Sequence, residues 1–293
     1  MKYISKMFIN CKTTLKTLIK NKNICFGSVF LILLCLTICV WPYTSFYIDP
    51  YKSSFVRLQS FSLQHWMGTD STGYDLFGRV LEGAKISLTI SFYAVVLGSF
   101  IGSFLGIISG YFRGIIDHVI NFICDILVIF PDIILAIVIM FFLEDSKFLE
   151  DSKKLSLVIV LSISNIPSFI RIIRANTLKI KQKDFIKASK ALGANNLRII
   201  VKHVIPHLYG IIITRITIGM ATVILSISAL GFMGLGIDPT KPEWGNILSS
   251  QKSNMRFHSH LFFGPFIVIL LTSLSFNLIG KGLIQFFNPK KDN

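Results

Sequence analysis

Long apolar runs separated by short polar segments dominate this chain of 293 residues. Six of these runs are long enough to be helical spans, because a membrane-crossing helix needs about 20 mostly apolar residues. The expected spans cover residues 24–43, 86–109, 116–143, 155–173, 209–236 and 261–287. The pattern therefore predicts an all-α, polytopic membrane protein with six transmembrane helices.

The second expected span carries glycines at a regular spacing of four residues: Gly98, Gly102, Gly106 and Gly110. Residues four apart lie on the same face of a helix. Small residues on one face allow two membrane helices to approach closely. We therefore expect this face to pack tightly against another span.

The composition agrees with a membrane protein and argues against a nucleic-acid-binding one. Of all residues, 52% are apolar and 15% are charged, whereas soluble domains carry about 25% charged residues. The formal net charge of +15 invites comparison with nucleic-acid binders. However, Lys and Arg gather in a few loops, as membrane topology and contact with anionic lipid headgroups require. Membrane lipid is thus the expected partner of this charge, and nucleic acid is not.

The distribution of Lys and Arg also predicts the orientation. If the N-terminus is inside, the inner segments carry 17 of these residues and the outer segments carry 9, which places both termini in the cytoplasm. The expected parts are a cytoplasmic N-terminal segment at 1–23, the first helix with a periplasmic loop at 24–85, a five-helix core at 86–287 and a cytoplasmic tail at 288–293. The core contains a cytoplasmic loop at 174–207.

Motifs for catalysis, metal binding or nucleotide binding are missing from the sequence. The five cysteines follow no metal-ligand or disulfide spacing, and neither a phosphate-binding loop nor a hydrolase motif is present. We therefore expect no cofactor and no enzymatic activity. If the protein moves a solute uphill, the energy must come from an ion gradient or from another subunit. A self-sufficient secondary transporter or channel remains the alternative to a subunit driven by a separate ATPase.

The loop after the fourth span is expected to begin with a short helix. Asp184 is placed to cap a helix over 185–192, and Gly193 to stop it. On this helix Phe185, Ala188, Ala191 and Leu192 share one apolar face. Such a face either docks a partner or packs beneath its own bundle, and the residues alone favour neither reading.

A second short helix is expected directly after the first one. Asn195 can cap a helix over 196–204, which would end at Pro206.

The same loop resembles the EAA loop of permease subunits of ATP-binding-cassette (ABC) importers. The resemblance rests on DFIKASKALGA at 184–194 with Ile199, His203 and Pro206 downstream. It implies a type I ABC-importer permease fold and a coupling helix that docks on a cytoplasmic ATPase. It also implies a second homologous permease, two ATPase subunits and a periplasmic substrate-binding protein as partners. The implied docking residues are Asp184, Phe185, Ala188, Ser189, Ala191, Leu192, Gly193, Ala194, His203 and Pro206.

Two further segments narrow the resemblance to one group of permeases. Residues 65–88 (HWMGTDSTGYDLFGRVLEGAKISL) are similar to a segment of dipeptide and oligopeptide permeases, as are residues 229–236 with 242–246. Together they resemble the C-type subunit of peptide and nickel importers. The stretch 229–232 and Glu243 also resemble the subgroup for antimicrobial-peptide uptake. The implied substrates are dipeptides, oligopeptides or cationic antimicrobial peptides.

Charged residues inside the expected spans are candidates for the translocation path, because such residues usually face a bundle interior or water. Asp125 and Asp132 flank Pro131 and, seven residues apart, would share a face of one helix. They could attract a cationic group such as a peptide amino terminus, or form structural hydrogen bonds. Arg215 is a candidate partner for one of them. Relatives often carry an acidic residue near positions 226–227, which this sequence lacks.

Overall fold

The computed structural model describes residues 21–53, 56–144 and 153–287, so most of the expected N-terminal segment and the whole tail at 288–293 lie outside the described residues. The helices are α3 (Lys22–Val40), α4 (Leu76–Phe112), α5 (Ile115–Ile129), α6 (Asp132–Glu144), α7 (Lys153–Lys181), α8 (Asp184–Ala191), α9 (Asn196–Ile199), α10 (Ile205–Phe232), α11 (Trp244–Gln251) and α12 (Ser259–Phe287). Short 3₁₀ helices follow α3 (Trp41–Tyr43) and α11 (Lys252–Asn254), and a π-helical turn (Ile200–Val204) joins α9 to α10.

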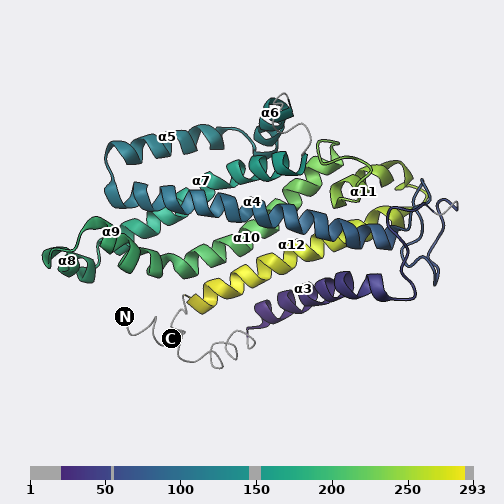
Figure 1. The fold of residues 1–293 in the computed structure, drawn as a ribbon, viewed down its shortest axis with the longest axis horizontal. Coiled ribbons are helices and arrows are strands. Elements are labelled where there is room, and N and C mark those ends of the chain that lie inside the picture. The colour runs from purple at the N-terminus through teal and green to yellow at the C-terminus, as the bar shows by residue number, and fades with distance from the viewer. Residues whose placement is uncertain (1–20, 54–55, 145–152, 288–293) are drawn as a thin grey trace.

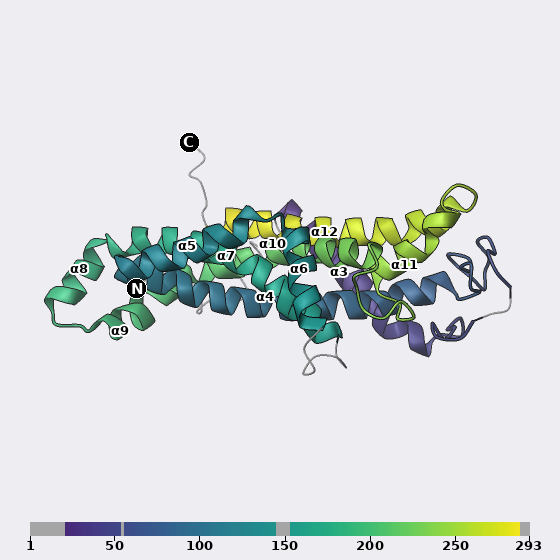
Figure 2. The same cartoon turned by 90° about the horizontal axis from the view of Figure 1, so that it is seen from above.

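The long helices lie side by side in an elongated bundle (Figure 1). The short helices α8 and α9 stand at one end, and α11 lies at the other end beside the loop segments 44–53 and 56–75 (Figures 1 and 2). Among the described residues, five helical segments are long and apolar enough to cross a membrane. With α5 and α6 counted together as one broken span, this gives the six spans that hydropathy predicts.

The third expected span is broken rather than straight. The helices α5 and α6 meet at an angle of 100°, with Phe130 in an extended conformation (φ −83°, ψ 134°) before Pro131. Proline disfavours the helical conformation of the residue that precedes it, which ends α5 at Ile129. The prediction that Asp125 and Asp132 share a face of one helix is therefore wrong, because they belong to different helices.

The glycine face of α4 packs against α7, as its spacing predicts. A methyl group added at Gly102 would lie 2.6 Å from Phe169 Cβ, and one at Gly106 would lie 2.9 Å from the carbonyl oxygen of Ile170. The hydroxyl of Ser162 donates a hydrogen bond of 3.0 Å to the carbonyl of Ala94 across the same interface. The two backbones thus come as close as glycine allows.

Candidate functional site

The segment at 184–199, formed by α8, α9 and their connection, is anchored to the end of the bundle by two isoleucines. Ile186 is 4% exposed and Ile199 is fully buried, and both pack with Ile107, Ile173 and Leu208 of the long helices. These apolar contacts hold a short segment that would be marginally stable as an isolated helix.

The expected apolar face of α8 lies outside this anchor. Leu192 is 89% exposed, Phe185 is 38% exposed, and Ala188 and Ala191 are also exposed. The described residues of the bundle thus leave Ala188, Ala191 and Leu192 uncovered, whereas Phe185 packs partly against α10. Packing of the whole face beneath the described residues of the bundle, one of the two possibilities left by the sequence, is therefore wrong.

The start of α8 differs from the prediction, whereas its end agrees with it. Lys183 holds the capping position, and Asp184 is the first helical residue, 3.1 Å from the ammonium group of Lys187. Gly193 has a positive φ of +80°, a conformation that glycine adopts at little cost. The following N–H group, of Ala194, donates back to the carbonyl of Ser189 at 3.1 Å, which closes the helix.

The start of the second helix is as expected, but its end is not. The Asn195 side chain accepts a hydrogen bond of 2.8 Å from the N–H of Arg198 and caps α9. Pro206 does not end the helix, because Ile200–Val204 form a π-helical turn that leads directly into α10. The N–H of Ile205 bonds to the carbonyl of Ile200, five residues back, and Pro206 sits in the first turn of α10, where its missing N–H is tolerated.

Three of the residues singled out in this loop meet where α8 faces the π-helical turn. The Nε2 atom of His203 lies 3.5 Å from the hydroxyl of Ser189. The ring of Phe185 is 6.1 Å from that of His203 and stacks on His207 at a centroid distance of 5.1 Å. These contacts link α8 to the π-helical turn and to the start of α10.

The candidate charges in the spans pair differently from the prediction. Asp125 Oδ1 lies 2.8 Å from Arg171 Nη2, and both side chains are about half exposed or more (66% and 48%). Arg215 is therefore not the partner of Asp125. The prediction failed because the pairing depends on how α5 and α7 are turned toward each other, which helix spacing does not reveal. Of Asp132, the structure describes the backbone at the start of α6 and not the side chain.

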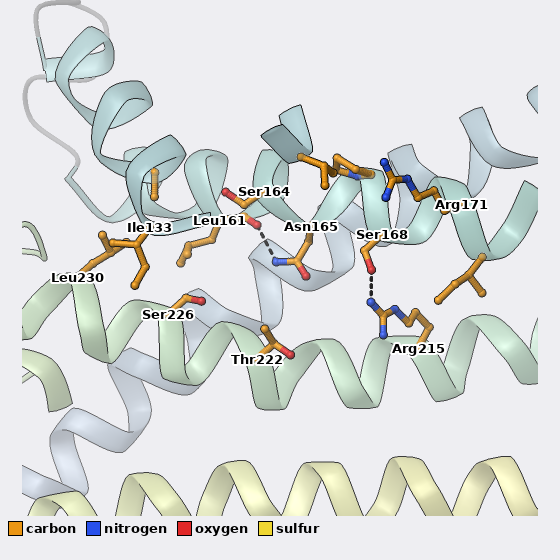
Figure 3. A pocket seen from close by; sticks show the side chains of 14 residues that line it. Ile133, Leu161, Ser164, Asn165, Ser168, Arg171, Arg215, Thr222, Ser226 and Leu230 are labelled. Atoms are coloured by element: carbon orange, nitrogen blue, oxygen red, sulfur yellow. Dashed lines mark hydrogen bonds between the residues drawn. The ribbon is translucent and has the colours of Figure 1, made fainter. Parts of the chain in front are cut away.

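Arg215 points into a cavity of about 400 Å³ between α7, α10 and the α5–α6 break (Figure 3). The guanidinium donates a hydrogen bond from Nη2 to the hydroxyl of Ser168 and lies 6.0 Å from the ring centroid of Phe169. Further polar side chains in the lining are Ser164, Asn165, Thr222 and Ser226.

The sequence analysis missed this polar lining, although a signal for it exists. Positions 164, 168 and 171 are four and three residues apart, and positions 215, 222 and 226 are seven and four apart. Each set therefore forms one polar stripe on an otherwise apolar helix.

Comparison with known proteins assigns the chain to a family. Residues 102–293 match the family described as "Binding-protein-dependent transport system inner membrane component". The chain belongs to this family. It is also 41% identical over 229 residues to the glutathione transport system permease proteins GsiD of Escherichia coli O6:K15:H31 and Shigella boydii serotype 4, covering 78% of this chain and 73% of each relative.

The fold of the permease agrees with that of a solved transporter. It is similar to the methionine ABC transporter MetNI in an inward-facing conformation, with a TM-score of 0.60 and 19% identity. The match covers 73% of this chain and 98% of the other. The expected resemblance to ABC-importer permeases is thereby confirmed. The permease is a transport subunit of the inner membrane that works with a substrate-binding protein, and ATP is hydrolysed by a separate subunit.

Proposed function

We propose that this permease forms half of the translocation pathway of an importer for small peptides and pairs with a second, homologous permease. The relatives at 41% identity are named for transport of glutathione, a tripeptide, which supports a small peptide as the substrate. The alternative of a self-sufficient secondary transporter or channel has no support from these similarities.

The exposed apolar face of α8 is the observation that carries the proposed coupling to ATP hydrolysis. A leucine that is 89% exposed at the end of a helix anchored by buried isoleucines is a rigid projection suited to a cleft on a partner. The segment at 184–199 is the coupling element in this proposal, and the ATPase covers Phe185, Ala188 and Leu192. Closure of the two ATPases would pull on this segment and switch the pathway between its inward- and outward-facing states.

The proposed orientation follows from the charge distribution and the position of α8. The end of the bundle that carries α8 faces the cytoplasm together with both termini. The opposite end, with α11 and the loop segments 44–53 and 56–75, faces the periplasm, where the binding protein delivers substrate.

The translocation path in this proposal follows the polar cavity beside α7 and α10. Arg215 lines it directly. Arg171, which is paired with Asp125, lines it as well, and Asp132 belongs to the adjoining α5–α6 break.

Affinity purification tests the coupling element. The permease, tagged at its C-terminus and extracted in mild detergent, should bring down a second permease and ATPase subunits. Leu192→Asp should abolish ATPase association without unfolding the permease, because the leucine side chain is almost fully exposed. The matched control is Phe257→Asp, which also adds a carboxylate at an exposed apolar position (81%) but at the other end of the bundle. It should retain the ATPases.

Two outcomes would contradict the proposal. If Leu192→Asp and the unmodified permease retain the ATPases equally well, the α8 face is not the dock. If crosslinking in native membranes captures neither an ATPase nor a second permease, the permease does not act as a coupled half-channel.

A further inference from the structure

The cavity beside α7 and α10 is polar where a membrane helix is expected to be apolar. Its lining includes Pro167, whose ring nitrogen cannot donate a hydrogen bond, so the carbonyl of Ile163 one turn earlier loses its helical partner. Asn165 and Ser164 lie on the same turn of α7. Free backbone groups and polar side chains at membrane depth occur where a helix lines a cavity rather than lipid. The cavity is therefore suited to a polar solute.

The guanidinium of Arg215 has fewer hydrogen-bond and ion-pair partners in this cavity than it could bind. An arginine side chain offers five N–H donors. The hydrogen bond that the described residues provide is the one to Ser168, and the Nε atom is buried without a partner. No carboxylate among the described side chains forms an ion pair with Arg215.

Among the described side chains, the charges around the cavity leave a net positive charge. Arg171 also lines it, but this guanidinium is paired with Asp125 at 2.8 Å. The described side chains thus place one neutralised pair and one free cation around the cavity. Asp125, one of the two carboxylates expected to attract a cationic group, is therefore already paired.

We infer that Arg215 is a specificity-determining residue that binds a carboxylate of the transported solute, such as the C-terminal carboxylate of a small peptide. A half-buried charge in an apolar bundle is costly unless it is paired. The planar fork of a guanidinium matches a carboxylate, which can accept two parallel hydrogen bonds. Ser168 fixes one edge of the guanidinium, and the remaining donors are available to a passing anion. This inference rests on the proposed peptide-import function and specifies its substrate chemistry.

The sign of the charge can be tested without knowing the substrate. In the assembled complex, with the five native cysteines replaced, Thr222→Cys places a thiol at an exposed position in the cavity lining. The labelling rates of an anionic (sulfonatoethyl) and a cationic (trimethylammonioethyl) methanethiosulfonate are then compared. Arg215→Gln should lower the anion-to-cation rate ratio by about tenfold or more, because it removes one unit charge close to the thiol.

Three further variants make the charge test specific. Lys281→Gln removes a cation from α12 that does not line the cavity, and it should leave the ratio unchanged. Ser168→Ala removes the hydrogen-bond acceptor but keeps the charge of Arg215, so the anion-to-cation rate ratio should again be unchanged. An unchanged ratio in Arg215→Gln would overturn the inference. So would a ratio set instead by Asp132, with Asp132→Asn shifting it strongly and Arg215→Gln not at all.

A transport assay tests the carboxylate itself. Proteoliposomes with the whole complex and its binding protein are supplied with dialanine or with its C-terminal amide. Arg215→Gln should lower the acid-to-amide uptake ratio by about tenfold or more, whereas Arg215→Lys should preserve part of it. Selection by the binding protein cancels when the variants are compared, because all of them receive substrate from the same protein.

The remaining outcomes separate this inference from the proposed function. An equal loss of both uptakes, with assembly and ATPase activity intact, would overturn the carboxylate site. Loss of the second permease in Arg215→Gln would overturn it in favour of an ion pair between subunits. If the unmodified complex carries neither peptide, the proposed substrate class fails, and the labelling ratio alone decides whether the site attracts anions.

Discussion

Ser87 in α4 donates a hydrogen bond of 2.9 Å from its hydroxyl to a carboxyl oxygen of Glu243, at the start of α11. The other carboxyl oxygen accepts from the N–H of Asn246 at 3.1 Å and so caps α11. Glu243 is completely buried. One side chain therefore both starts a short helix and ties it to the central helix of the bundle.

The burial of Glu243 makes a pH dependence of stability testable. Burial raises the pKa of Glu243 above 4.5, although hydrogen bonds from Gly245, Ser87 and Asn246 act in the opposite direction. A raised pKa means that the folded state holds the proton more tightly than the unfolded state does. The stabilisation is therefore full below pH 4.5 and is lost as the pH rises through the raised pKa.

Glu243→Gln keeps the shape of the side chain and cannot ionise. The melting temperature of this variant in mild detergent should rise relative to that of the unmodified permease as the pH increases from 4.5. Asp238→Asn is a control of opposite sign, since hydrogen bonds from the backbone and side chain of Thr240 lower the pKa of exposed Asp238. Its difference from the unmodified permease should shrink as the pH falls. A difference for Glu243→Gln that does not vary with pH would refute the raised pKa.

Close contact between α4 and α7 predicts that Gly102→Ala is destabilising. The added methyl group would lie 2.6 Å from Phe169 Cβ and 3.0 Å from the carbonyl oxygen of Ile166, so the helices must separate. We expect a loss of about 1–3 kcal/mol, the usual range for overpacking. Gly264→Ala is the matched control, because the nearest atom to its methyl group is the sulfur of Met67 at 3.5 Å. Thermal unfolding in detergent should show a lowered melting temperature for Gly102→Ala alone.

The features that were predictable from the sequence are those fixed by local rules. The positions of the spans follow from the length of the apolar runs, and the packing face of α4 follows from the four-residue glycine spacing. The end of α8 follows from the glycine at 193, which adopts the positive φ that closes the helix. Asn195 caps α9 for a similarly local reason. Each of these depends on residues within a few turns of one helix.

The features that were not predictable depend on distant parts of the chain. Two prolines, Pro131 and Pro206, behave differently from each other. Pro131 ends a helix, whereas Pro206 is accommodated after a π-helical turn. The partner of Asp125 is set by the rotation of α7, which brings Arg171 rather than Arg215 into reach. Helix spacing shows which residues share a face, but not which faces meet.

The ion pair between Asp117 and Arg174 predicts a strong coupling between α5 and α7. Two parallel hydrogen bonds of 2.6 and 2.7 Å join the side chains, and Asp117 is only 7% exposed. Asp117→Ala would leave the guanidinium without its partner. We expect a cost near the lower end of about 3–5 kcal/mol, because the Arg174 side chain is 31% exposed.

A double-mutant cycle measures this coupling. The double variant Asp117→Ala/Arg174→Ala should be destabilised by less than the sum of the single variants, since neither charge is left alone. Asp125→Ala is the control, because its pair with Arg171 is exposed and should be worth about 1 kcal/mol or less. Additive effects at 117 and 174 would show that the pair does not couple the helices.

Gly193 allows the backbone and the surface of the coupling element to be tested separately. Its φ is +80°, and no atom lies within 4 Å of a methyl group added there, so a substitution strains the backbone without causing a collision. Gly193→Val, with a β-branched side chain, should cost about 1–3 kcal/mol of local strain and displace the chain beyond Leu192. Uptake should fall while the amount of permease in the membrane is maintained.

The pair Gly193→Asn and Gly193→Asp isolates the effect of charge. Both side chains tolerate a positive φ and have nearly the same shape, so they differ mainly by one negative charge beside the exposed Leu192. If the ATPase covers this apolar surface, burying the unpaired carboxylate is costly, and Gly193→Asp should lose uptake and ATPase association whereas Gly193→Asn retains both. Equal uptake by the two variants would mean that the surface beside Leu192 stays in water throughout the transport cycle.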